Sequence, residues 1–246
     1  MMIQEKFFDC DVEKAPLLQA SSPRLMKYSD IPSTIETTDA VIPGDPLFNY
    51  LLESESNNHE RFRDHSMRYF GMCIRVYSGV AWCVEDGRGF VAFEEHYKSR
   101  NGTEKILYGV SGIVSIIMQS LKSREKRKRG AELKKKMQNL LDTTLGKDKL
   151  KQMVELTTIA VHPKLQGKGY GTQLGKVVSA VADSKGRECF LFSSNVKANT
   201  VFYNNLRYEI IDTFTLGEDN PKWDKEPVTI ALMVRKPSDG TGAFRH

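Results

Sequence analysis

The sequence is poor in cysteine, and its cysteines are not arranged to hold a metal ion. Cys10, Cys73, Cys83 and Cys189 are far apart, no two of them form a Cys-x-x-Cys pair, and no cluster of cysteine and histidine is present. Zinc sites and small disulfide frameworks depend on such spacings. We therefore expect free thiols in a reducing compartment and no metal cofactor.

Long hydrophobic runs are absent as well. The longest apolar stretch, Ile113 to Met118 with its neighbours, is shorter than the roughly 20 residues that cross a bilayer. The first residues lack the apolar core of a signal peptide. A content of 40% hydrophobic and 27% charged residues is typical of a globular protein in water. These features predict a cytoplasmic location from which the nucleus could be reached and no membrane partner, and 246 residues are enough for one large domain or two small ones.

Acidic residues do not balance the basic ones, and the excess is local. The formal net charge is +5, and residues 122–136 carry most of the imbalance. Such a run could bind nucleic acid or act as a localisation signal. No aromatic residues interleave with it, as a single-strand binding surface would require. We interpret 122–129 as a solvated helix and turn and do not expect nucleic acid as a partner, although a nucleic-acid binder that uses 122–136 stays open as an alternative.

Residues 154–171 carry the clearest pattern in the chain. Val154 to Val161 is apolar and rich in β-branched residues, as strands are, and Pro163 ends the ladder. Three glycines follow within five positions, and after them apolar residues recur at helical spacing. The glycines are Gly167, Gly169 and Gly171. The first turn of a helix has unpaired N–H groups and favours negative charge, so a glycine loop at this place predicts an anion site.

Two common phosphate loops do not fit this segment. A Walker A loop ends in Gly-Lys-Ser/Thr, whereas Gly175-Lys176 is followed by Val177. A dinucleotide fingerprint directly follows the first strand of a βαβ unit, but this segment lies late in the chain and no second such unit follows.

A third family does fit. Gln166-Gly-Lys-Gly-Tyr-Gly171 resembles the Gln/Arg-x-x-Gly-x-Gly/Ala motif of the GNAT superfamily, the GCN5-related N-acetyltransferases, and the preceding Ile-Ala-Val-His-Pro resembles the fourth strand of that family. Asn199 and Phe202-Tyr203 resemble its Asn-x-x-Phe-Tyr motif. The chain departs from the family at Arg207-Tyr208, where Gly-Phe is usual. The resemblance covers 150–235 well, 40–100 loosely and 106–150 hardly at all.

The resemblance implies the GNAT fold, an α/β (α+β) architecture, as a single domain over residues 1–246. Its mixed, mostly antiparallel central sheet splays between the fourth and fifth strands and is flanked by helices. In this chain we expect a helical insertion at about 106–150, before the fourth strand, and a short flexible C-terminal tail at about 237–246. Patterning predicts helices that start near Asp30 and Pro46, a helix over 59–77, a hairpin of 79–86 with 90–97, and helices over 110–121 and 131–145.

The resemblance also implies acetyl transfer from acetyl-CoA to a primary amine. The pantetheine arm would pair with the fourth strand, and the pyrophosphate would rest on backbone N–H groups of the glycine loop. A backbone N–H in the bulged fourth strand would polarise the acetyl carbonyl. The residues implied for acetyl-CoA binding are Ile159, Ala160, Val161, Gln166, Gly167, Lys168, Gly169, Tyr170, Gly171, Thr172, Asn199 and Phe202.

Two residues are candidates for the proton transfers. A primary amine is mostly protonated at pH 7, so a general base is expected. Glu155 precedes Gln166 by the interval of the catalytic glutamate in the histone-acetylating branch, and Tyr203 is placed by the family pattern to protonate the leaving thiolate. The competing interpretations are a solvent-facing glutamate and a packing tyrosine. His162, which precedes Pro163, is interpreted as structural, and whether Glu155 acts directly or through water is open.

The acceptor is the least defined part of the prediction. Carboxylates with aromatic walls suit a cationic amine, and the candidates are Asp45, Phe48, Trp82, Glu94 and Glu95. The stretch that begins at Asp45 loosely resembles fungal small-molecule relatives. We expect a small cationic molecule such as an aminoglycoside or polyamine, and a monomer or homodimer. The alternatives are acetylation of protein lysines or N-termini, and a non-catalytic regulatory module that binds CoA.

Overall fold

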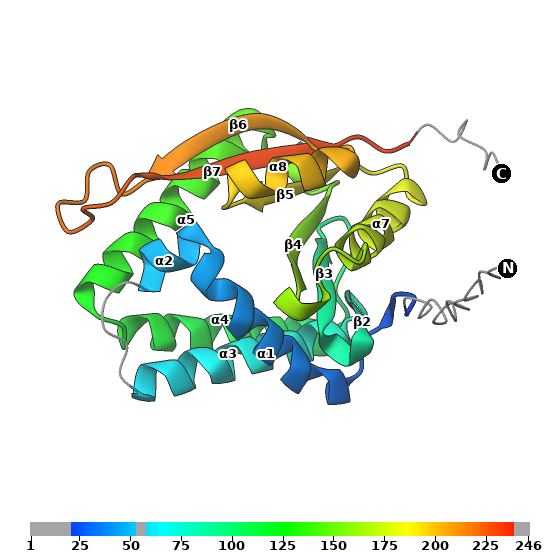
Figure 1. The fold of residues 1–246 in the computed structure, drawn as a ribbon, viewed down its shortest axis with the longest axis horizontal. Coiled ribbons are helices and arrows are strands. Elements are labelled where there is room, and N and C mark those ends of the chain that lie inside the picture. Colours follow the sequence, from blue (N-terminus) through cyan, green and yellow to red (C-terminus); the bar gives the residue numbers. More distant parts are fainter. Residues whose placement is uncertain (1–20, 53–57, 239–246) are drawn as a thin grey trace, which may run out of the picture.

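The computed structural model describes residues 21–52 and 58–238. Its seven-stranded sheet extends from β6 and β7, along the top of Figure 1, down to β2 at the lower right. The strand order is β1-β2-β3-β4-β5-β7-β6, and every neighbouring pair is antiparallel except β4 with β5. The expected mixed, mostly antiparallel sheet is therefore confirmed. The strands are β1 (Arg24–Leu25), β2 (Ala81–Val84), β3 (Gly89–Glu95), β4 (Val154–Val161), β5 (Cys189–Ser193), β6 (Glu209–Leu216) and β7 (Val228–Arg235).

Helices cover both faces of this sheet. They are α1 (Ile31–Val41), α2 (Pro46–Leu52), α3 (Asn58–Tyr77), α4 (Gly102–Ser120), α5 (Arg124–Thr144), α6 (Lys147–Leu150), α7 (Tyr170–Asp183) and α8 (Val196–Asn205). Leu174 of α7 packs in one apolar cluster with Phe93 of β3, while Ile31 of α1 and Met72 of α3 pack with Ala92 of the same strand. Because neighbouring residues of a strand point to opposite faces, α7 covers one face and α1 and α3 cover the other.

Most of the predicted elements lie where the pattern placed them. The helix predicted over 59–77 is α3, and Pro46 opens α2 at a first-turn position, where its missing N–H is not needed. The predicted hairpin is β2 with β3, joined by the short turn Glu85–Gly87. β2 is shorter than expected at both ends, and the turn takes its last two predicted residues, whereas β3 begins one residue earlier than predicted and ends two residues earlier.

The two helices of the region 106–150 are longer than predicted. Asn101 accepts a hydrogen bond from the N–H of Glu104, whose carboxylate accepts one from the N–H of Asn101, so α4 starts at a capping box. Ser123 caps α5 by accepting from the N–H of Lys126. These local caps set the helix starts, whereas the prediction followed only the apolar spacing.

The prediction that 122–129 is a solvated helix and turn is wrong for two of its eight residues. Lys126 and Arg129 are buried, with side chains only 5% and 4% exposed. The ammonium group of Lys126 lies 2.7 Å from a carboxylate oxygen of Glu60 in α3. Arg129 donates to the carbonyl of Tyr50 at 2.7 Å and to that of Lys222 at 3.1 Å. These two cations are part of the fold, because each joins α5 to another segment of the chain.

Parts of the earlier expectations fall outside the described structure. Cys10 and residues 239–246 of the expected C-terminal tail lie there. Cys73, Cys83 and Cys189 are free thiols, and the last two are buried. None of the helices in residues 21–52 and 58–238 combines the length and the apolar character that crossing a bilayer requires.

Candidate active site

The sheet opens between β4 and β5. The two strands pair in parallel only at Val154 with Cys189 and at Glu155 with Phe190, although β4 continues to Val161 and β5 to Ser193. Beyond these pairs the strands diverge, as Figure 1 shows. One edge of β4 therefore carries backbone groups that no strand of the described chain pairs with, which is the splay expected from the sequence.

A bulge lies in β4 beside this opening. Ala92 of β3 is opposite Thr158, but the next residue, Phe93, is opposite Leu156, so Thr157 has no partner across the strands. Its hydroxyl instead donates to the carbonyl of Ala92 at 2.9 Å. A bulge re-aims the neighbouring backbone groups, as the expected oxyanion donor in the fourth strand requires.

The glycine loop follows directly after β4. Gly167 and Gly169 have φ values of +78° and +80°, which L side chains rarely adopt, and a Cβ at either position would meet no atom within 4 Å. Gln173 is the first residue of α7 whose N–H reaches a backbone acceptor, the carbonyl of Gly169 at 3.1 Å. The N–H groups of residues 170–172 thus have no backbone acceptor among the described residues, and the loop can admit an anion close to the backbone.

Two contacts fix this loop to the rest of the opening. The side-chain amide of Gln166 donates to the carbonyl of Val161 at 3.0 Å, at the end of β4. Phe202 of α8 packs against Gly171, where an added Cβ would lie only 3.3 Å from the ring. Asn199, one turn before Phe202, is half-buried, and its side chain has no hydrogen bond to the described residues. The two motifs found in the sequence are therefore neighbours in space.

Glu155 is the last residue of β4 that pairs with β5 before the two strands diverge. Its neighbours Val154 and Leu156 are buried on the side of α7, so Glu155 points to the opposite face. Its carboxylate lies 2.9 Å from Nε2 of His96, and the two side chains are 26% and 32% exposed. The imidazole stacks on Phe190 of β5 at a centroid distance of 5.8 Å. A carboxylate with one partner and access to solvent can accept a proton at this place.

Tyr203 of α8 is buried, and burial together with the nearby charge of Asp45 raises its pKa to about 12. The phenol therefore keeps its proton at neutral pH. Asp45 lies just before α2, where it accepts from the N–H of Leu47 at 2.8 Å and from the hydroxyl of Ser194, after β5, at 2.6 Å. The phenol of Tyr203, a potential proton donor, thus lies near Asp45. The hydrogen bond of Asp45 with Ser194 links the start of α2 to the end of β5.

Comparison with known proteins gives a clear result only at the level of structure. No family model matches the chain, and no curated protein matches its sequence. Arylalkylamine N-acetyltransferase 2 from Aedes aegypti superimposes with a TM-score of 0.56 at 13% identity, over 87% of this chain and 97% of that one. A GNAT superfamily phosphinothricin acetyltransferase from Sinorhizobium meliloti, solved with AcCoA, gives 0.52 at 12%, over 92% and 94%. An N-acetyltransferase from Staphylococcus aureus Mu50 gives 0.50 at 12%, over 88% and 98%.

The chain has the GNAT fold. The expectation drawn from the glycine-loop motif and from Asn-x-x-Phe-Tyr is thereby confirmed for the architecture, including the parallel contact of β4 with β5. At these identities the likeness concerns the fold, and the roles of individual residues in this GNAT fold remain predictions. Among the described residues, no group of three or more His, Cys, Asp or Glu could hold a metal ion.

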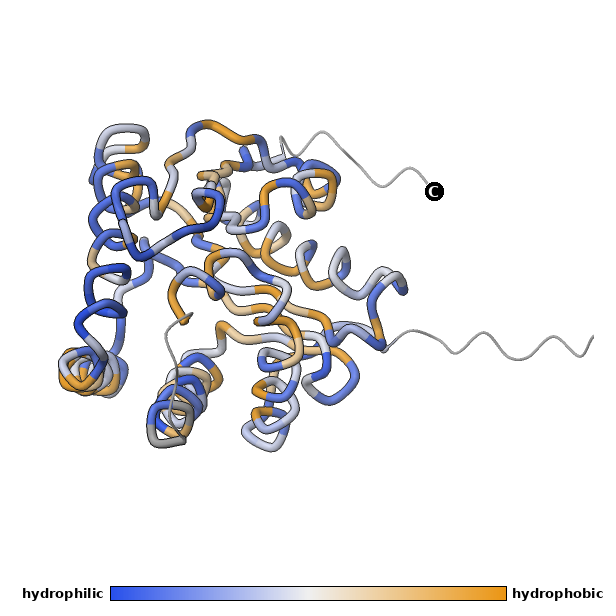
Figure 2. Tube along the Cα trace, turned by 60° about the vertical axis from the view of Figure 1, so that its left-hand side comes forward, coloured by the Kyte–Doolittle hydropathy of each residue, from blue (hydrophilic) through white to orange (hydrophobic). Residues whose placement is uncertain are grey.

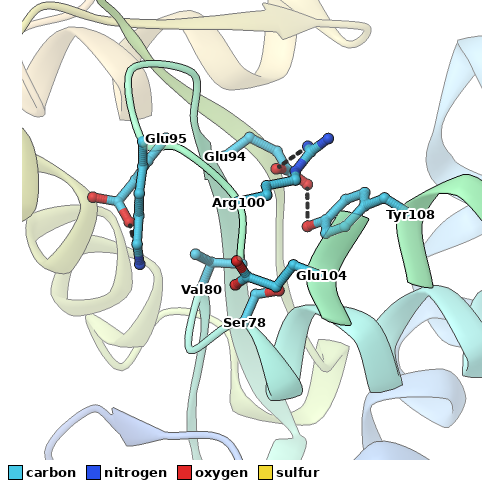
Figure 3. A pocket seen from close by; sticks show the side chains of 8 residues that line it. Ser78, Val80, Glu94, Glu95, Arg100, Glu104 and Tyr108 are labelled. Carbon is cyan, nitrogen blue, oxygen red and sulfur yellow. Dashed lines mark hydrogen bonds and ion pairs between the residues drawn. The ribbon is translucent and has the colours of Figure 1, made fainter. Parts of the chain in front are cut away.

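The residues predicted for the acceptor do not all meet in this GNAT fold. Glu94 lies opposite Glu155 in the register, but its carboxylate already accepts from Tyr108 at 3.0 Å and pairs with Arg100 at 3.2 Å (Figure 3). Glu95 accepts from Tyr97 at 2.5 Å. Both carboxylates line a small pocket with Ser78, Val80, Lys98, Arg100, Glu104 and Tyr108. Their charges are therefore partly balanced from within the chain.

The other acceptor candidates divide between the two sides of the sheet. Trp82 packs against the apolar cluster under α7, on the side opposite to Glu155. Asp45 and Phe48 lie at the start of α2, where Phe48 is 36% exposed. Of the five residues, these two and Glu94 lie on the side of the sheet where a substrate could approach Glu155.

His96 was missed by the sequence analysis. It follows β3 and belongs to no motif, so nothing in its neighbourhood marks it. Only the register of β3 with β4, which sets Glu94 opposite Glu155, brings the imidazole to the carboxylate. A histidine one or two residues beyond a strand that pairs with the fourth strand is the signal that could have found it.

Proposed function

We propose that the protein is an acetyl-CoA-dependent N-acetyltransferase that acts on a primary amine of a small cationic molecule. The observation that carries the proposal is the opening between β4 and β5, which ends at a glycine loop whose first-turn N–H groups have no backbone acceptor in the described part of the chain. An extended thioester with a pyrophosphate suits such a strand edge followed by an anion site. The GNAT fold and the AcCoA complex of one structural neighbour support it.

In this proposal the chain holds acetyl-CoA along β4. Ile159, Ala160 and Val161 present backbone groups at the free edge to the pantetheine arm, with Gln166 bracing the end of the strand. The N–H groups from Gln166 to Thr172 receive the pyrophosphate, and Asn199 and Phe202 border it from α8. Bound acetyl-CoA supplies the thioester, whose acetyl group is the part transferred.

Glu155 is proposed to take the proton from the substrate ammonium, either directly or through water. The neutral amine can then attack the thioester carbonyl, whose developing charge a backbone N–H near the bulge at Thr157 stabilises. His96 is proposed as the positioning residue of this step. Its imidazole holds one carboxylate oxygen, and its own place is fixed by Phe190.

Tyr203 is proposed to return a proton to the thiolate when the carbon–sulfur bond breaks. Its raised pKa keeps the phenol protonated over the working range of pH, so a donor is always present. The nitrogen loses two protons in all: Glu155 takes one from the ammonium, the second passes to water as the amide forms, and Tyr203 gives one to sulfur. Exchange with water then resets both groups.

The acceptor end is proposed to lie near Asp45, Phe48 and Glu94, on the same side of the sheet as Glu155. The aromatic ring and the carboxylate at the start of α2 suit the hydrocarbon and the charge of a small amine. The carboxylates also explain why a cation would be preferred over a neutral amine.

The direct test is release of free CoA in the presence of amines. Purified protein with acetyl-CoA is supplied with polyamines, aminoglycosides, arylalkylamines, and a lysine peptide, and thiol release is corrected for hydrolysis without amine. We expect at least one small cationic amine to raise release well above hydrolysis. Activity on the peptide alone would refute the small-molecule acceptor, and no release with any amine would refute acetyl transfer to amines.

A further inference from the structure

Helix α4 has two unlike faces. Its inner face carries Glu104, which is buried, and Tyr108, which bonds to Glu94 of β3. Its outer face is apolar and faces solvent. The exposed side chains are Ile106 (67%), Val110 (44%), Ile113 (62%), Ile116 (72%), Ile117 (50%) and, directly after the helix, Leu121 (51%). In Figure 2 this helix is seen nearly end-on at the lower left, at the outer edge of the molecule, with hydrophobic residues along it.

The exposed apolar side chains of α4 form one continuous patch, whereas single apolar residues scattered over a surface do not. No charged residue occurs between Lys105 and Lys122, so the apolar stripe is uninterrupted for the length of the helix. Six large side chains with these exposed fractions form a patch on the order of several hundred Å², which is the upper end of what a monomer usually exposes. A standard interface covers about 800 Å² per partner, and its core is apolar. The patch has the size and character of an interface core.

We infer that two copies of this chain pair through the outer face of α4, with the two helices antiparallel. A two-fold interface brings a patch onto itself, and an apolar stripe is complementary to its own copy. With Ile113 at the axis, Gly109 of one helix lies opposite Ile117 of the other. A Cβ at Gly109 would meet nothing within 4 Å, so the glycine leaves a hole for that side chain.

The hole at Gly109 favours the antiparallel direction, because in a parallel pair Gly109 would lie opposite Gly109 and Ile117 opposite Ile117. The charges at the ends of α4 do not select a direction. A parallel pair brings Lys105 against Lys105 and Lys122 against Lys122, and the antiparallel pair brings Lys105 of each helix next to Lys122 of the other.

A lipid surface fits the helix less well than a second copy does. Helices that lie on membranes carry lysine and arginine along the face opposite to the apolar one. The opposite face of α4 instead packs within the protein, through Tyr108 and Glu104. This inference concerns assembly and does not depend on the proposed activity.

The test is the mass of the full chain in solution as a function of concentration, by light scattering and sedimentation equilibrium. We expect a dimer whose dissociation constant rises at least tenfold in Ile113→Lys, because the substitution sets two lysines together at the axis. Ile116→Lys is the second variant. The matched control is Val201→Lys on α8, which changes a residue with a similar exposure of 70% and should leave the dimer intact.

Each outcome of these mass measurements either supports or overturns pairing through α4. A wild-type mass that stays monomeric at all concentrations would overturn the inference. So would a dimer that survives both α4 substitutions, since another surface would then hold it. Binding of the monomer to neutral lipid vesicles, lost in Ile113→Lys, would assign the patch to a membrane instead. Equal circular dichroism of all variants confirms that each one folds.

Discussion

Glu155 and His96 are 59 residues apart in the sequence, and their side chains come into contact only in the folded chain. If the carboxylate is the base, Glu155→Gln should lower kcat by tenfold to ten-thousandfold while the affinity for acetyl-CoA stays unchanged. The loss should shrink as pH rises, because the amine then loses its proton without help. The measurement is kcat against pH for wild type and variant with the best amine.

Two further variants separate catalysis from the loss of a charge. Glu188→Gln removes a carboxylate of similar exposure, 24% against 26%, that is also paired with a basic group, Lys149 at 2.6 Å. It should leave kcat unchanged. His96→Gln keeps a hydrogen-bond donor near Glu155 and should retain more activity than His96→Phe. Equal losses in Glu155→Gln and Glu188→Gln would remove Glu155 from the proposed role.

Single residues also mark the limit of what the sequence could predict. The glycine loop was predicted because both of its positive-φ glycines fall in a recognisable motif. Arg207 stands where the family has glycine, and the structure places it at a φ of +66°, so the turn is kept although the residue is unsuited to it. His96 could not be predicted, because its contact with Glu155 depends on strand register, which no local pattern specifies.

At the scale of elements, α5 is held by the buried members of its basic run. Arg129 bridges α5 to the end of α2 and to the segment before β7, and Lys126 pairs with Glu60 of α3. Removing one partner leaves buried polar groups without a counterpart. We expect Arg129→Ser to lower the free energy of unfolding by about 3 kcal/mol, measured by urea denaturation.

The same run contains its own control. Arg127 and Lys128 are exposed neighbours on the same helix, and the double variant Arg127→Ser, Lys128→Ser removes more charge than Arg129→Ser does. It should change the free energy of unfolding by less than about 0.5 kcal/mol per site. If the exposed pair proved as costly as Arg129, the charge of the run rather than its buried contacts would stabilise α5.

The helices of this region show why composition misled the sequence analysis. A run such as 122–129 is normally solvated, and nothing in it distinguishes Lys126 and Arg129 from their neighbours. Their spacing of three residues puts them on one face of a helix, but the partners come from α2, α3 and the loop before β7. The existence of two helices was predictable and their starts are marked by the caps at Asn101 and Ser123, whereas the buried contacts of Lys126 and Arg129 were not predictable.

At the scale of the whole molecule, two short motifs were enough to predict the fold. The strand, glycine loop and helix of 154–183 and the motif that ends at Tyr203 frame the opening between β4 and β5, so the architecture follows once both are recognised. The N-terminal half has weaker patterns. Its contribution to the acceptor side, from Asp45 and Phe48, rests on tertiary contacts such as that of Asp45 with Ser194.

The central claim is that acetyl-CoA binds at the glycine loop beside β4. The measurement is the shift of the melting temperature with acetyl-CoA in wild type, Gly169→Asp and Gly186→Asp. Both glycines have positive φ, +80° and +59°, and open space at the Cβ, so the two variants carry similar backbone strain. Only Gly169→Asp places a carboxylate where a phosphate would lie.

At a concentration of about 100 times the dissociation constant, the ligand should stabilise the native protein by roughly 2.7 kcal/mol, which raises the melting temperature by about 5–10 °C. We predict this shift for wild type and for Gly186→Asp, and its loss in Gly169→Asp. A shift of equal size in Gly169→Asp would show that acetyl-CoA binds elsewhere. No shift in wild type would contradict the account as a whole.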